Sequence, residues 1–154
     1  MSQKFKQIQI SNLDNRFKTL SFAPKPKVGW IKTIRQALSM PLAFPANKLG
    51  ISKQGVAQLE KNESEDTITL KSLRQLAEAM GCELHYAIIP HERSLKKLIE
   101  KRATEKATGI VNDVNKTMAL EDQEIKDDIT SIKRLTKDLA ENVNFKLWSS
   151  DENN

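Results

Sequence analysis

The sequence predicts a mostly α-helical fold with one β-strand. Apolar residues recur at helical spacing along most of the 154 residues. Only five glycines and five prolines interrupt them, and aromatic residues make up 5% of the chain, too few for a large β-sandwich or barrel. No apolar run is long enough to span a bilayer. The single cysteine excludes an internal disulfide, so we expect a soluble protein of a reducing compartment, most simply the cytoplasm.

The charge is unevenly distributed along the chain. Residues 1–62 hold 11 Lys and Arg against 2 Asp and Glu, a net charge of +9. Residues 63–92 have a net charge of −4, residues 93–111 of +4 and residues 112–154 of −4. A basic first third favours a polyanion as its partner, and the acidic tail favours a different one. Ordinary solvated faces explain the same pattern about equally well.

The first predicted helix covers residues 3–20, because Phe5, Ile8, Leu13 and Phe17 follow at helical spacing. Two prolines in residues 23–27 end it and predict a short extended linker. Residues 1–27 are therefore expected to form an N-terminal helix and its linker. Helical spacing returns at residue 30 and lasts until a proline at residue 41.

Residues 42–61 predict two short helices joined by a tight turn. Ala46 is small enough for the second helix to cross there, and Gly50 tolerates the positive φ of a turn. Ser52 is a natural N-cap for the second helix, which Val56 and a leucine one turn later would pack against the first. Pro45 fits if it lies in the first turn, where amides lack helical partners. This pattern is typical of a DNA-binding helix–turn–helix; a generic pair of helices is the alternative.

The second helix would present a polar and basic face to DNA. Glutamine can pair with adenine and lysine with guanine or phosphate, so we expect Gln54 and Gln58 to read bases. Lysine and arginine side chains around them are expected to contact phosphates. The complete set of predicted DNA-binding residues is Ser52, Lys53, Gln54, Ala57, Gln58, Lys61, Lys48, Lys32 and Arg35.

Residues 70–80 form the next predicted helix, capped by Thr69 and ended by a glycine at residue 81. Residues 82–89 then alternate and read as the one strand. Because a lone strand is unstable, we expect it to pair with its copy in a second chain through Leu84, Tyr86 and Ile88. Residues 28–90 would thus be a helix–turn–helix domain that ends in a dimerisation strand.

Residues 91–148 predict a C-terminal helical extension, followed by a disordered tail at 149–154. A long polar helix covers about 94–117, residues 118–120 interrupt it, and a second helix covers about 121–143. The second helix has an apolar seam at near-heptad spacing. The seam either folds back on the first helix, packs against another subunit or binds a partner. The predicted partner-binding residues are Ile125, Ile129, Ile132, Leu135 and Trp148.

No motif for catalysis, cofactor binding or metal binding accompanies these elements. The chain lacks a Walker loop, a GxGxxG run and paired His or Cys ligands. We therefore expect no catalytic residue, no cofactor and no metal, and an enzyme is the least favoured class.

Five segments carry a family resemblance. Residues 29–31 (GWI), the LGISKQGVAQLEK run, and TITLKSLRQLAEAMGCELHYAIIP resemble Xre/Cro-type repressors, and together with TMALEDQ and KLW they resemble the mobile mystery protein A family. The resemblance implies a bacterial repressor or antitoxin encoded beside a Fic-domain protein. The favoured reading is a dimeric, sequence-specific repressor that regulates its own operon. An antitoxin that acts mainly by binding a Fic-domain toxin is the alternative.

Overall fold

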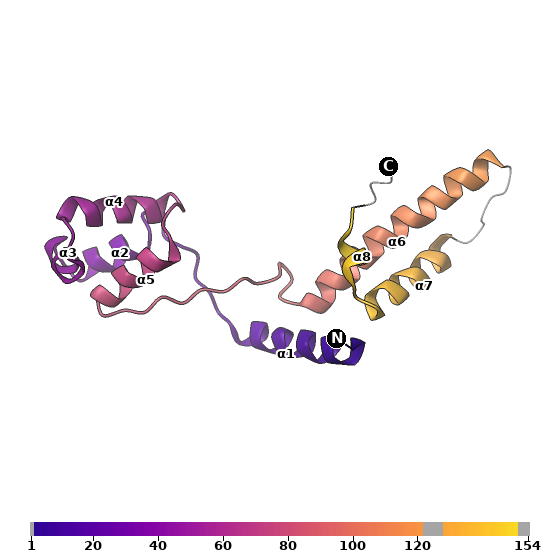
Figure 1. Cartoon of the computed structure of the whole chain (residues 1–154), viewed down its shortest axis with the longest axis horizontal. Coiled ribbons are helices and arrows are strands. Elements are labelled where there is room, and N and C mark those ends of the chain that lie inside the picture. The colour runs from indigo at the N-terminus through magenta and orange to yellow at the C-terminus, as the bar shows by residue number, and fades with distance from the viewer. Residues whose placement is uncertain (1, 122–127, 151–154) are drawn as a thin grey trace. The chain divides into compact units, whose positions relative to one another are not determined.

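A computed structural model describes residues 2–121 and 128–150. The chain divides into two compact units (Figure 1). One unit comprises residues 21–87, and the other comprises residues 1–20 together with 88–154. We call them the helix–turn–helix unit and the bundle unit. The N-terminal helix and the C-terminal extension, which are separate segments in the sequence, pack into one bundle.

The helix–turn–helix unit contains four short helices: α2 (Trp30–Ala37), α3 (Ala43–Leu49), α4 (Lys53–Ser64) and α5 (Leu70–Ala79). The predicted caps are confirmed. The Ser52 hydroxyl accepts from the Gly55 amide at the start of α4, and the Thr69 hydroxyl accepts from the Ser72 amide at the start of α5. Gly50 adopts the left-handed conformation, with φ of 65°, and ends α3.

Small and branched side chains hold these helices together. Ala46 of α3 is 1% exposed and Val56 of α4 is fully buried, which confirms the predicted crossing. Leu76 of α5 belongs to the same core, together with Ile31, Ala77 and Met80. Pro45 is the third residue of α3 and is buried, so the helix keeps its first turn as expected.

The predicted strand is wrong. Residues 82–90 are extended but form no ladder, and the described residues contain no β-strand. A strand needs a neighbouring strand whose backbone groups hydrogen-bond with its own, and no described segment forms such a ladder with this one. Cys82 and Leu84 instead pack on the helical core, while Tyr86 and Ile88 are 62% and 89% exposed. The alternation in the sequence therefore reflects a segment that covers a core on one side.

The bundle unit joins α1 (Gln3–Thr19) to α6 (Leu95–Leu120), α7 (Asp128–Glu141) and the short α8 (Phe145–Trp148). Figure 1 shows α7 running back beside α6. The fold-back reading of the C-terminal seam is thus confirmed for the described residues. The interruption predicted at 118–120 is wrong, because α6 continues through Leu120. Ile125 and residues 151–154 of the predicted tail lie outside the described residues.

Polar contacts fasten α1 to the C-terminal helices at both of its ends. The Asp14 carboxylate accepts from the amides of Leu95 and Lys96, at 2.6 and 3.2 Å, and from the Ser94 hydroxyl, so that it caps α6 from another element. Near the other end, the Lys6 ammonium donates to the Val143 carbonyl at 3.1 Å. These bonds join positions more than 75 residues apart.

The bundle core is small. Ile99 and Ala103 of α6 and Leu147 of α8 are buried, and Ile10, Leu139, Ala140 and Val143 pack around them. Arg102 donates to the carbonyl of Leu147 at 2.9 Å, so that α8 is held against α6. Among the described residues, no helix combines the length and the apolar character that crossing a bilayer requires.

Candidate nucleic-acid interface

The outward face of α4 gathers most of the predicted base-reading residues. Lys53, Gln54, Ala57, Gln58 and Lys61 are all exposed, while Val56, Glu60 and Glu63 of the same helix are buried. This division follows from the 3.6-residue period, which puts the two sets on opposite sides. Ser52 caps the helix just before the first of them. The face is therefore open to solvent.

One neighbour orients a predicted base-reading side chain. The Asn62 side-chain oxygen accepts from the Gln58 amide nitrogen at 2.9 Å. The bond holds the Gln58 amide in one orientation and leaves its oxygen as an acceptor toward the exposed face. Sequence reasoning missed Asn62, although its position four residues after Gln58 on one helix was a usable signal.

A buried carboxylate positions α2 against α4. Glu63 of α4 is 3% exposed and accepts from the Ile31 amide at 3.1 and 3.3 Å, which caps α2. A Cβ at Gly29 would lie 2.6 Å from a Glu63 oxygen, so only glycine fits there. Burial raises the pKa of the Glu63 carboxyl, and the amides of Ile31 and Trp30 and the charge of Lys25 offset only part of this. The sequence analysis did not identify this contact.

Arg35 occupies a structural position. Its guanidinium makes a two-bond ion pair with Glu60, at 2.5 Å from Nε and 3.1 Å from Nη2, and also donates to the Met40 carbonyl at 3.0 Å. The side chains of both partners are largely covered. Most of its donors are therefore engaged within the unit, and Arg35 has less to offer a phosphate than the sequence analysis expected.

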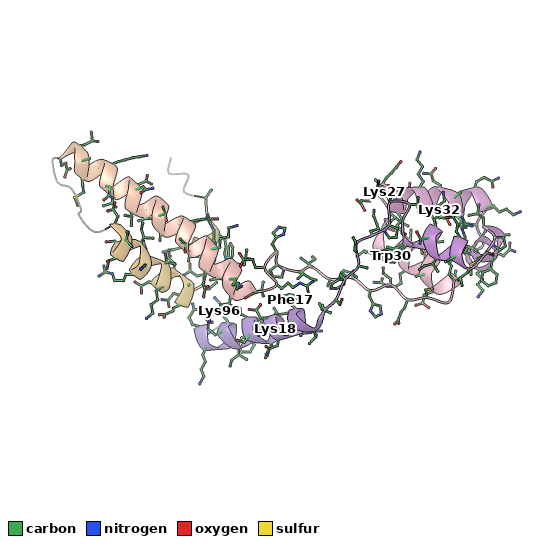
Figure 2. The ribbon with its side chains drawn as sticks, turned by 180° about the vertical axis from the view of Figure 1, so that it is seen from behind. Phe17, Lys18, Lys27, Trp30, Lys32 and Lys96 are labelled. Carbon is green, nitrogen blue, oxygen red and sulfur yellow. The ribbon has the colours of Figure 1, made fainter. Side chains whose placement is uncertain are left out.

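A basic hollow of about 420 Å³ lies beside the exposed face of α4. Lys27, Lys32 and Lys61 line it, with Arg35, Glu60 and Ala57 among the other lining residues. Figure 2 labels Lys27 and Lys32 on this unit. Because Glu60 is neutralised by Arg35, the hollow carries an excess of positive charge suited to a phosphate.

The linker before α2 is fastened where it borders this hollow. The Lys25 ammonium donates to the carbonyl of Glu63 at 2.8 Å and pairs with Asp66. The predicted linker is therefore tied to the end of α4, which keeps Lys27 at the hollow. Lys48, on α3, is exposed and lies 4.7 Å from the centroid of the Phe44 ring.

The residues predicted for dimerisation and for partner binding differ in how exposed their side chains are. Leu84 covers the core, while Tyr86 and Ile88 are exposed. Ile132 and Leu135 are half-buried in the bundle unit, and Ile129 and Trp148 are 69% and 50% exposed. Within each group the described side chains therefore range from half-buried to largely exposed.

Comparison with known proteins bears on one part of the chain. Residues 31–86 match the Helix-turn-helix family, here of the Xre/Cro type. The matched part covers α2 to α5 and ends at Tyr86, and domains of this kind occur in DNA-binding transcriptional regulators. Searches of curated proteins and of solved structures returned no match. The narrower resemblance to mobile mystery protein A stays a prediction.

Proposed function

We propose that this protein is a sequence-specific transcriptional repressor whose α4 enters the major groove of DNA. The observation that carries the proposal is the exposed row Lys53, Gln54, Ala57, Gln58 and Lys61 on the second helix of a helix–turn–helix. Glutamine and lysine donors at these places suit the base edges of the major groove, and Ala57 suits a thymine methyl group.

The charges around this helix support the same surface. Lys27 and Lys32 flank α4 at the basic hollow, and Lys48 is exposed on α3. Phosphate contacts from these residues position the helix, whereas the glutamines carry the selectivity. We expect the affinity to fall steeply with salt, because each lysine that neutralises a phosphate releases a counterion.

The test is selection of binding sites from random duplex DNA by the full-length protein, followed by titration at about 0.15 M salt. A repressor of this kind should enrich one motif and prefer it over random duplex by about a thousandfold or more. Equal affinity for selected and random duplexes would contradict the proposal.

We further propose that the repressor acts as a homodimer on a near-palindromic operator that includes its own promoter. One short recognition helix reads too few base pairs for a unique site, and a dimer doubles them at half-sites about 34 Å apart. The exposed Tyr86 is apolar surface that a second copy would cover. Sedimentation of a complex with DNA should show two chains, and one chain on the whole site would contradict dimer binding.

An antitoxin that binds a Fic-domain toxin is the second candidate. The sequence resemblance suggests it, and the exposed Ile129, Phe145 and Trp148 of the bundle unit favour a protein contact there. Mixing the full chain with the purified Fic-domain product of the neighbouring gene should give a stable complex. Ile129→Asp should weaken that complex and leave DNA binding intact. Failure of the wild type to form a complex would remove this candidate.

A further inference from the structure

The bundle unit contains a groove that the repressor function does not use. It lies between α1, α6 and α7 and has a volume of about 630 Å³, within the range of about 300–1,000 Å³ typical of small-molecule sites. Its apolar lining consists of Ile10, Ile99, Ile132 and Ala140, three of which belong to the bundle core or pack on it. The groove is thus part of the packed structure and not a gap beside it.

The charged residues of the groove carry a small excess of positive charge. Lys96, Lys133 and Lys137 line it, opposed by Glu100 and Glu141. Lys137 lies 3.8 Å from Glu141, so that these two charges offset each other. Within the part of the chain that the structure describes, no carboxylate lies within 4 Å of the ammonium of Lys96 or Lys133. Lys96 projects from the start of α6, next to α1 (Figure 2).

Thr136 adds a hydrogen-bonding group that lacks a partner. Other threonines of the bundle donate to the carbonyl four residues earlier, as Thr104 does to Glu100 at 2.9 Å and Thr117 does to Asp113 at 3.1 Å. Thr136 lines the groove, and its hydroxyl oxygen is buried and makes no hydrogen bond with the described residues. A buried hydroxyl without a partner is unfavourable, so a hydrogen bond is missing from the wall of the groove at Thr136.

We propose that this groove binds a small organic anion with an apolar body, such as an aromatic or aliphatic molecule that bears one carboxylate or sulfonate. The isoleucines contact the body, and Lys133 and Lys96 attract the anionic group. An acidic or neutral polar ligand without an apolar body does not suit the isoleucine lining. A cation is disfavoured by the unpaired lysines.

Two walls of the groove are the helices that border the chain connections to the helix–turn–helix unit. The chain enters that unit after α1 and leaves it before α6, and these two helices form two of the three groove walls. Asp14 joins the same two helices. A ligand seated there therefore contacts the elements from which both connections leave.

The first experiment uses two fluorescent probes that differ by one sulfonate group. Anilinonaphthalene sulfonate is anionic, and N-phenyl-1-naphthylamine is its neutral body without the sulfonate. Titration of the full-length protein should show that one molecule of the anionic probe binds to each chain. Thr104→Trp and Gln7→Trp, which fill the groove from α6 and α1, should each weaken both probes by about tenfold or more. The matched control Thr117→Trp lies on α6 outside the groove and should bind like the wild type.

A charge variant then tests the anionic specificity. Lys133→Gln should lower the affinity for the sulfonate probe by about two- to fivefold, as expected for a partly exposed ion pair. The affinity for the neutral probe should not change. Lys116→Gln, on α6 outside the groove, is its control.

Two results would overturn the proposal. One is unchanged binding of both probes to the groove-filling variants, and the other is equal weakening of both probes by Lys133→Gln. If both filling variants lose their helical circular dichroism, the double variant Lys96→Gln with Lys133→Gln decides, because its sulfonate affinity must fall below that of Lys116→Gln. The outcome is independent of DNA binding, which these measurements do not involve.

Discussion

Single side chains of α4 divide into those that read bases and those that attract phosphate. Gln54 is exposed on the outward face, and Lys61 lies at the basic hollow. We expect Gln54→Ala to lose about 1–3 kcal/mol of discrimination at one base pair. Lys61→Ala should weaken binding to all DNA sequences alike and lower the slope of log affinity against log salt concentration by about one. Titrations with single-base variants of the selected site, at several salt concentrations, distinguish these outcomes. A uniform loss for Gln54→Ala would contradict its role in base reading.

The buried Glu63 gives the helix–turn–helix unit a particular pH dependence. Burial raises the pKa of its carboxyl above 4.5, so its contribution to stability is present at low pH and is lost as the pH rises through the raised pKa. Glu63→Gln keeps an oxygen for the Ile31 amide but cannot ionise. The free energy of unfolding of the wild type relative to this variant should therefore fall as the pH rises above 4.5. With Trp148→Phe in both proteins, Trp30 fluorescence reports this unit; a constant difference would contradict the prediction.

Among the elements, α1 depends on contacts far away in the sequence. Burial alone would raise the pKa of the Asp14 carboxyl, but the amides of Leu95 and Lys96 and the Ser94 hydroxyl lower it on balance. Asp14→Ala should destabilise the bundle unit by about 0.5–2 kcal/mol at pH 7, as for the loss of a helix cap. The loss should shrink as the pH falls below 3.8, where the wild-type carboxyl also becomes neutral.

Trp148 fluorescence in a Trp30→Phe background follows this transition in denaturant. Asp113→Ala, at an exposed position of α6, is the control and should stay within about 0.5 kcal/mol of the wild type. Equal effects of the two substitutions would show that Asp14 does not fasten α6.

The elements also show what the sequence could predict. Local signals were sufficient for the helices of the helix–turn–helix unit, because Ser52, Thr69 and Gly50 act within one turn of their own position. Long-range contacts were not predictable. Alternation at residues 82–89 is shared by a strand and by a segment that covers a core, and only the absence of a ladder among the described residues separates them. Asp14 and Glu63 cap helices that start far away in sequence, so no local pattern marks them.

For the whole molecule, the division into two units predicts which fragment keeps DNA binding. A chain that ends after Arg93 still contains α1 but lacks α6, α7 and α8, the helices of the bundle unit to which α1 belongs. Residues 21–93 should therefore bind the selected DNA within about threefold of residues 1–93, and the shorter fragment should have fewer exposed apolar groups and a lower tendency to aggregate. Electrophoretic mobility shifts and light scattering test both points. Loss of selectivity only in the shorter fragment would show that α1 contributes to recognition.

The discontinuous bundle also affects how the protein folds as it is made. Asp14 and Ser94 are 80 positions apart, and the entire helix–turn–helix unit lies between them. At about 5–20 residues per second, ribosomes need roughly 4–16 s to cover that distance. Small helical units fold within about a millisecond to microseconds. The helix–turn–helix unit is therefore expected to fold on the nascent chain seconds before α6 has been synthesised. During that time the apolar side of α1 stays exposed to solvent.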